Sequence, residues 1–227
     1  TGELSVNQET LAQEFQVKWQ DDKWSWIAGL YYLNDEATDN TAFDILRDLR
    51  FSAVGDDVNC SAPAGNPTGF CPEGFIFKSK SGTNQEINSL ALYFDTSVNI
   101  NDDLKLSMGV RYTDEEINHT SFFFYDEPTA GNPALPNFPG SSSNDFKNIS
   151  GRVLLDYQLN DDVLVYGGIT TGFKAGGIQS TSDGVSPYAE EELVSYETGF
   201  KSTWNNGTIR FNGSAFYYDY SDLQVFA

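Results

Sequence analysis

Few side chains in this sequence could carry out chemistry. The only histidine among the 227 residues is His119. Neither a histidine-based catalytic triad nor a metal site with several histidine ligands can therefore form within the chain. We expect His119 to be either solvated or packed against a loop. The sequence predicts no catalytic site and no cofactor, which argues against an enzyme.

The two cysteines, Cys60 and Cys71, lie in a stretch rich in glycine and proline, CSAPAGNPTGFC. No histidine or further cysteine lies near enough in the sequence to complete a zinc site. We expect a disulfide that staples an exposed loop, which would place the protein in an oxidising compartment. The alternative is a reduced pair in a cytosolic protein.

Two further groups of residues could contact a ligand. Five carboxylates within 35–48 could bind calcium through their oxygens, although their spacing fits no known calcium-binding loop and a solvated acidic face is the other interpretation. These residues are Asp35, Glu36, Asp39, Asp44 and Asp48. The aromatic run SFFFYD (121–126) is either an aromatic girdle or a hydrophobic surface that contacts a ligand. The substrate-contact candidates are Phe122, Phe123, Phe124 and Tyr125.

The charge of the chain excludes one class of partner. There are 33 acidic and 13 basic residues, giving a formal net charge of −20. Such a chain repels phosphate backbones, so we expect no binding to nucleic acid. The acidic surplus suits a cationic or metal-bearing ligand, or is solvated surface.

The elements that must position these residues are predicted to be strands. In 104–112, Leu104, Leu106, Met108, Val110 and Tyr112 alternate with polar residues and glycine. The same period of two recurs at 11–19, 24–32, 90–100, 149–159, 163–173, 194–204 and 208–218. We therefore expect eight strands of roughly 9 to 16 residues. One short helix is expected at 41–50, inside a loop.

The connections between the predicted strands alternate in length. Tight polar turns are expected at 20–23, 101–103, 160–162 and 205–207, where the residue types tolerate hairpin geometry. Long segments rich in Gly, Pro, Ser and Asn lie between them, at about 38–84, 126–144 and 175–190. Short turns at one end and long loops at the other are typical of bacterial outer-membrane β-barrels.

The composition and the tryptophans agree with a membrane barrel. Aromatic residues make up 15% of the chain, yet the mean hydropathy is −0.40, as expected when only every second strand residue meets lipid. Every tryptophan lies within four residues of a predicted tight turn, and indole rings favour the lipid–water interface. The predicted interfacial girdle consists of Trp19, Trp24, Trp26 and Trp204.

Side-chain parity predicts the opposite, lumen-facing surface. Five charged residues should point into the lumen, where they could pair with a plug domain: Lys105, Arg111, Arg152, Glu197 and Lys201. A glycine also follows the last residue of each predicted turn by six positions, as Gly29, Gly109, Gly168 and Gly213. Gly213 falls on the apolar face, so we expect one predicted turn boundary to be wrong by one residue.

Four segments resemble the β-barrel domain of TonB-dependent receptors. YETGFKSTWNNGTIRFNGSAFYYDYSDLQV (196–225) is similar to the late-barrel pattern of that family, and VYGGITTGFKAGG (165–177) is similar to its tyrosine-rich strand. LKLSMGVRYTDEE (104–116) and WSWIAGLYYLNDE (24–36) resemble two further strands. The resemblance implies an all-β, antiparallel transmembrane barrel of about 22 strands, of which this chain holds about eight.

The resemblance also implies a function and a set of partners. Residues 1–227 would be a partial barrel domain that lacks the plug, the early strands and the terminal strand, and we expect it to be inactive alone. The intact receptor would import a scarce nutrient, foremost a ferric siderophore. It would act through TonB and its inner-membrane energising complex, which engage the plug region. It would contact outer-membrane lipid and lipopolysaccharide.

Two other functions remain open from the sequence. A passive outer-membrane porin would have similar strands and no plug. A soluble β-sandwich, acting as a carbohydrate-binding or adhesin module, would bury its apolar strand faces against a second sheet.

Overall fold

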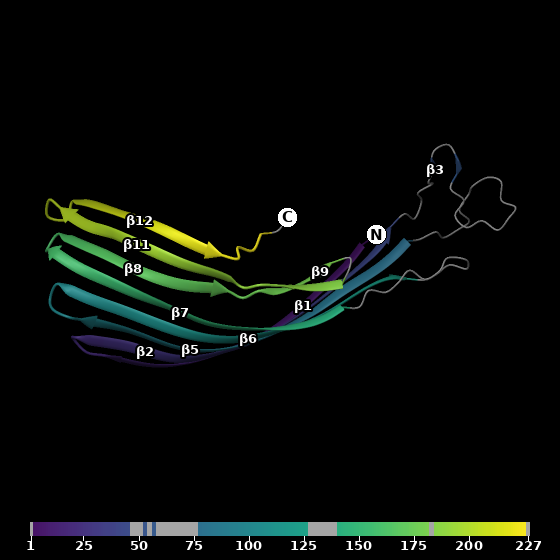
Figure 1. Cartoon of the computed structure of the whole chain (residues 1–227), viewed down its shortest axis with the longest axis horizontal. Coiled ribbons are helices and arrows are strands. Elements are labelled where there is room, and N and C mark those ends of the chain that lie inside the picture. Colours follow the sequence, from purple (N-terminus) through teal and green to yellow (C-terminus); the bar gives the residue numbers. More distant parts are fainter. Residues whose placement is uncertain are drawn as a thin grey trace.

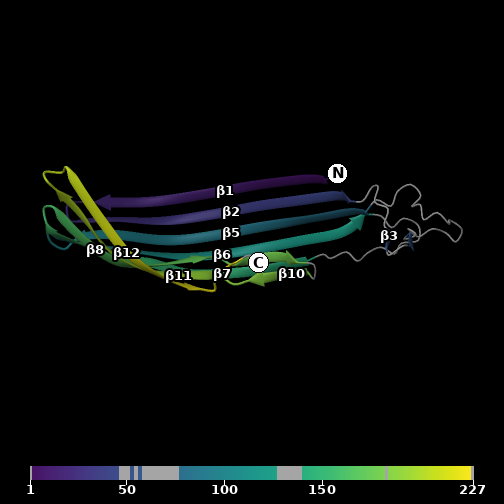
Figure 2. The same cartoon turned by 90° about the horizontal axis from the view of Figure 1, so that it is seen from above.

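The computed structural model describes residues 2–45, 52–53, 56–57, 77–126, 140–181 and 184–225. Its main element is one antiparallel sheet of eight strands, curved like a gutter (Figures 1 and 2). In sheet order the strands are β1 (Gly2–Gln20), β2 (Trp24–Ile45), β5 (Phe77–Asn99), β6 (Leu104–Asp126), β7 (Gly140–Asn160), β8 (Val163–Lys174), β11 (Glu191–Trp204) and β12 (Ile209–Ser221). No helix in the described part of the chain is long and apolar enough to cross a membrane.

Two short pairs complete the described structure. Strands β3 (Ser52–Ala53) and β4 (Asp56–Asp57) pair with each other. Strands β9 (Gly177–Thr181) and β10 (Gly184–Tyr188) form a hairpin between β8 and β11.

The four predicted tight turns are confirmed, and they lie together at one end of the sheet (left in Figure 1). In the last turn Asn205, Asn206 and Gly207 have φ values of 52°, 51° and 86°, a left-handed conformation that Asn and Gly adopt readily. The amide of Thr208 donates to Asn205 O at 3.2 Å, so this turn includes Thr208. The expected one-residue error is found here, and it explains why Gly213 lies on the apolar face.

The eight predicted strands are confirmed, but most extend further than predicted. Strands β5 and β6 have 23 residues each, because pairing continues beyond the point where one face stops being apolar. The predicted helix at 41–50 is wrong for its first half: Thr41 pairs with Leu4 and Ser81 within the sheet. Two neighbouring strands satisfy the backbone there, and this outweighs the weak local helix propensity. Residues 46–50 lie outside the described residues.

The pairing register defines two faces, because partners in an antiparallel ladder project to the same side. We call the side of Met108 and Val110 the apolar face. Its other members include Phe15, Val17, Leu30, Leu92, Phe94, Val153, Leu155, Ile169, Tyr196 and Tyr217. The opposite side carries Gly109 and Arg152, and the β9–β10 hairpin packs on it through Ile178 and Ile117; we call it the concave face.

The apolar face is uncovered. Met108, Val110 and Phe15 are 39%, 50% and 69% exposed, and no second sheet packs on them among the described strands. So large a contiguous apolar surface is not tolerated in water by a monomeric soluble domain. The sandwich alternative therefore lacks the second layer that it requires.

The apolar band has a defined upper limit. On β6 it runs from Leu104 to Tyr112, and Asp114 follows on the same face, 3.5 Å from Lys147 Nζ. Eight residues at roughly 3.3 Å each, tilted by about 40°, span ~20 Å, close to the ~25 Å apolar band of membrane barrels. Beyond this limit β6 continues as a strand to Asp126, but without a continuous apolar face.

Candidate functional site on the concave face

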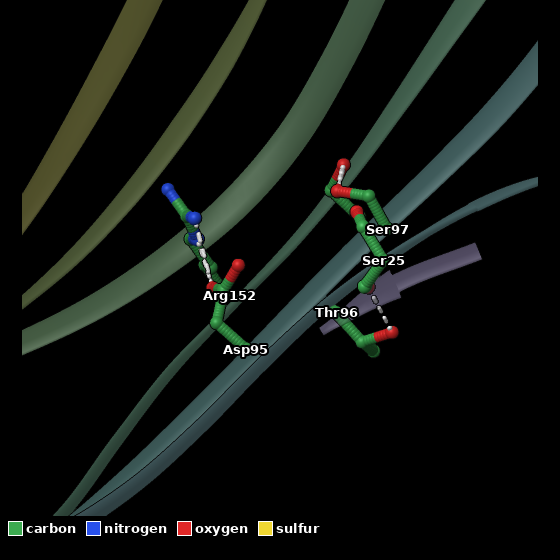
Figure 3. A network of polar contacts seen from close by, with 6 residues as sticks. Ser25, Asp95, Thr96, Ser97 and Arg152 are labelled. Carbon is green, nitrogen blue, oxygen red and sulfur yellow. Dashed lines mark hydrogen bonds and ion pairs between the residues drawn. The ribbon is translucent and has the colours of Figure 1, made fainter. Parts of the chain in front are cut away.

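An ion pair crosses three strands of the concave face. Asp95 of β5, Gly109 of β6 and Arg152 of β7 are partners in one row. Arg152 donates Nε to Asp95 Oδ2 at 3.0 Å, and its Nη2 lies 2.8 Å from the same oxygen (Figure 3). Any Cβ at position 109 would overlap Asp95 Oδ2. The glycine therefore allows the two charged side chains to meet above it.

Tyr93 makes a similar bridge on the other side of β5. Gln16, Gly29 and Tyr93 form one row, and the Tyr93 ring lies over Gly29 where a Cβ would otherwise be. The Tyr93 hydroxyl donates to Glu14 Oε1 at 2.6 Å and accepts from Gln16 Nε2 at 2.6 Å. Tyr93 of β5 therefore reaches across β2 and links β5 to β1 by side-chain hydrogen bonds.

A third bridge lies near the end of the sheet formed by β8, β11 and β12. The Tyr166 ring lies over Gly199, and its hydroxyl donates to Glu197 Oε1 at 3.0 Å. Lys201 Nζ lies 5.7 Å from the centroid of the same ring, within range of a cation–π interaction. Gly29, Gly109 and Gly199 therefore share one role, which is to accommodate a side chain from a neighbouring strand.

The Asp95–Arg152 pair and the Tyr93 bridge border a groove of about 320 Å³. Its polar lining includes Glu14, Tyr93, Asp95, Arg111, Ser150 and Arg152. The Arg111 guanidinium carbon lies 5.5 Å and 5.9 Å from the ring centroids of Tyr31 and Tyr93. Guanidinium groups in this setting suit bidentate contact with a carboxylate or another planar anion.

The register confirms that the five charged residues predicted to face the lumen share the concave face: Lys105, Arg111, Arg152, Glu197 and Lys201. Arg152 and Glu197 already have partners within the sheet. Pairing of these residues with a plug domain stays a prediction.

The β9–β10 hairpin covers the concave face at the end away from the tight turns. Ile178 of β9 is buried against Ile117 of β6 and Phe146 of β7, and Val185 of β10 packs against the same cluster. This is the main apolar core of the described structure. The prediction of a simple long loop at 175–190 did not anticipate it. The sequence signal for this packing is the presence of two aliphatic residues, Ile178 and Val185, in a segment of mainly small and polar residues.

His119 belongs to this contact. It lies on β6, is 5% exposed, and its Nε2 is 3.0 Å from Ser180 Oγ of β9. Of the two alternatives expected for His119, the structure shows the second: the side chain packs against the segment that was predicted to be a loop. Burial lowers the pKa of His119 below its ordinary value, because removal from water disfavours the imidazolium.

The tryptophans of the predicted girdle lie at the end of the sheet that carries the turns. Trp19 and Trp26 are register partners, and the Trp19 and Trp24 rings pack edge to face at a centroid distance of 5.3 Å. Trp24 Nε1 donates to Thr96 Oγ1 at 2.6 Å. Thr96 Oγ1 in turn donates to Ser25 O at 3.0 Å (Figure 3). Trp204 is half exposed at the last turn. Their position at a lipid boundary stays a prediction.

The aromatic run does not form one surface. Phe122 projects to the apolar side and lies over Gly82, whereas Phe123 projects to the concave side. The side chains of Phe124 and Tyr125 lie outside the described residues. Of the two described side chains, only Phe123 is placed to meet a ligand in the lumen, and that role stays a prediction.

The acidic residues at 35–48 whose side chains are described, Asp35, Glu36 and Asp39, do not all share one face, and the side chain of Asp44 lies outside the described residues. Asp35 projects to the concave face and accepts hydrogen bonds from Gln8 Nε2, at 3.0 Å, and from Thr10, whereas Glu36 projects to the opposite side. Asp48 lies outside the described residues, as do Cys60 and Cys71 with their predicted disulfide. The described segments contain no group of three or more His, Cys, Asp or Glu residues that could hold a metal ion.

The sequence matches a known family of barrel proteins and several individual relatives. The family described as TonB dependent receptor-like, beta-barrel, matches residues 7–227. The pesticin receptors of Yersinia enterocolitica and Yersinia pestis are each 25% identical over 142 residues, which covers 61% of this chain and 20% of each relative.

Solved structures share the fold. The ferric yersiniabactin uptake receptor FyuA of Yersinia pestis has a TM-score of 0.73 at 18% identity, over 99% of this chain and 30% of that one. The siderophore receptor PiuA of Acinetobacter baumannii has a TM-score of 0.61 at 12% identity, over 94% and 32% of the two chains. The chain thus spans about a fifth to a third of the length of these proteins. Its uncovered apolar band, its turn arrangement and the family match over 7–227 together show that the chain belongs to the TonB-dependent receptor β-barrel family of the bacterial outer membrane.

Proposed function

We propose that this chain forms part of the barrel wall of an outer-membrane receptor that takes up a ferric siderophore in a TonB-driven cycle. The observation that carries the proposal is the family match over nearly the whole chain. The relatives support the substrate class: one is named as a ferric yersiniabactin uptake receptor and another as a siderophore receptor. The full protein would add a plug domain and further strands, to about 22 in all.

In this proposal the two faces of the sheet have different tasks. The apolar face anchors the wall in lipid, and the backbone is satisfied by inter-strand hydrogen bonds, as a membrane interior requires. The concave face borders the plug. Its bridged charges, such as Asp95 with Arg152, keep the wall polar and fixed in shape while the plug moves, and Arg111 is available for an acidic group of the plug.

The proposal is tested in the organism that encodes the protein. Deleting the full gene should abolish uptake of one radiolabelled ferric siderophore from a panel, and deleting the TonB gene should abolish the same uptake. Uptake that survives loss of the receptor gene for every siderophore tested would refute the substrate class. Uptake that needs the receptor but not TonB would indicate a passive porin, whose gene would also encode no plug of about 120–150 residues before the barrel.

A further inference from the structure

The β9–β10 hairpin is attached to the wall through two short hinges. Residues 175–176 and 189–190 are not part of any strand, and Gln224 lies between them. Its side-chain amide donates to Ala175 O at 3.1 Å and to Ala189 O at 3.0 Å, and its backbone amide donates to Glu191 Oε2 at 2.9 Å. Gln224 therefore ties the two ends of the hairpin to one point at its base.

Beyond the hinges, the hairpin is held down by two contacts. Ile178 and Val185 bury apolar surface on Ile117 and Phe146, and Ser180 meets His119. The His119 ring is buried beneath the hairpin, and its Nδ1 has no hydrogen-bond partner in the described structure. A neutral imidazole tolerates one unpaired acceptor nitrogen, whereas an imidazolium needs two acceptors for its two N–H groups.

Among the described residues, no charged side chain stabilises an imidazolium at this position; Asp183, in the turn of the hairpin, lies outside the described residues. Its register partners are Gln85 of β5 and Ser142 of β7, and among the described residues of the hairpin only Tyr188, at the base, is titratable. The nearest carboxylate on the same face of β6 is Glu115, four residues toward the turn. A charged His119 would thus be left buried without an opposite charge.

We propose that the β9–β10 hairpin is a strap across the concave face, and that protonation of His119 releases it. Docked, the strap narrows the end of the lumen away from the tight turns; released, it exposes Ile117, Phe146 and the imidazole. The switch is independent of which ligand the receptor imports. It would make the mouth of the barrel sensitive to mild acidity.

The direction of the pH effect follows from burial. Docking keeps His119 neutral, so the docked form is favoured above the pKa of the released histidine, about 6.5, and weakened as the pH falls below it. Between pH 7.5 and 5.5 the ratio of released to docked strap should rise roughly tenfold.

The test measures the distance between the strap and the wall in the full-length protein in lipid nanodiscs. Nitroxide labels are attached through Ser186→Cys on the strap and Ser143→Cys on the side of β7 opposite the concave face, both exposed, with Cys60 and Cys71 replaced by serine. Double electron–electron resonance at pH 7.5 should give one short distance, and a longer component should grow at pH 5.5. His119→Gln, which retains a donor toward Ser180 but cannot be protonated, should stay docked at both pH values.

The Ile178→Asn variant supplies the released reference, because it removes the apolar contact at any pH. A wild-type distance distribution that is the same at pH 7.5 and 5.5 would overturn the proposal. So would a His119→Gln variant that opens in acid as the wild type does. An Ile178→Asn variant that keeps the wild-type distance would show that these contacts do not hold the strap.

Discussion

The tight approach of β7 and β8 at Gly168 leads to a sharp prediction. Gly168 and Gly172 lie on the same strand and on the same face, four residues apart. A Cβ at Gly168 would overlap the Leu154 side chain and lie 2.7 Å from Val153 O, whereas a Cβ at Gly172 meets nothing within 4 Å. Alanine at 168 should therefore destabilise the protein, and alanine at 172 should not.

The size of the difference can be worked from these contacts. An ordinary carbon–oxygen contact is about 3.5 Å, so the two strands must separate locally by roughly 0.8 Å, and overpacking of this kind costs about 1–3 kcal/mol. At Gly172 the substitution only restricts the unfolded chain, which stabilises by about 0.4–1 kcal/mol. The two variants should therefore differ by about 1.5–4 kcal/mol in the free energy of unfolding.

The assay is urea-induced unfolding of the full-length protein in lipid vesicles, followed by tryptophan fluorescence. Leu154→Ala combined with Gly168→Ala serves as a control, because it removes the side-chain overlap and leaves the clash with Val153 O. The double variant should remain destabilised relative to Leu154→Ala alone. Equal stability of Gly168→Ala and Gly172→Ala would refute the assigned strand register and the close contact.

Three further predictions concern the wall and its loop. Asp95→Asn should lower the free energy of unfolding by at most about 1 kcal/mol, because Asp95 and Arg152 are partly exposed. The double variant with Arg152→Gln should be no less stable than the single variant. Additive losses of stability in the same unfolding assay would disprove the pairing. Met108→Arg should cost about 2–4 kcal/mol at the middle of the apolar band and reduce the heat-modifiable folded species on gels, whereas Met108→Leu should not; a stable Met108→Arg protein would contradict lipid contact there. The predicted disulfide should make unreduced full-length protein migrate faster than Cys60→Ser, and identical migration without reductant would rule it out.

The sequence predicted the lipid-facing part of the sheet well for a physical reason. In 104–112 one face of the strand must be apolar throughout, so the period of two is visible in a single strand. Beyond Tyr112, charged and polar residues such as Asp114 enter the apolar face of β6, and the alternation that indicates a strand disappears although pairing continues to Asp126. This is why the strand lengths were underestimated and why Thr41 was assigned to a helix.

The contacts on the concave face were harder to predict, because they depend on which strand residues become neighbours. The glycines at 29 and 109 were visible as a repeat, but their role needs the rows Gly29–Tyr93 and Asp95–Gly109–Arg152. The burial of His119 depends in the same way on Ser180, which lies 61 residues away in the sequence. The alternation of side chains along each strand predicts the correct face for Arg111 and Arg152. It cannot predict which side chains they contact on the neighbouring strands.

The central claim is that one face of each strand contacts lipid while the other borders the lumen. Single nitroxide labels at each position from 104 to 112, in the full-length protein in lipid vesicles, test it directly through collision rates with oxygen and with a water-soluble nickel complex. If this face contacts lipid, oxygen accessibility peaks at Leu106, Met108 and Val110, and nickel accessibility never peaks there. Labels at those three positions that are as accessible to nickel as to oxygen, or that show no alternation with their neighbours, would contradict it.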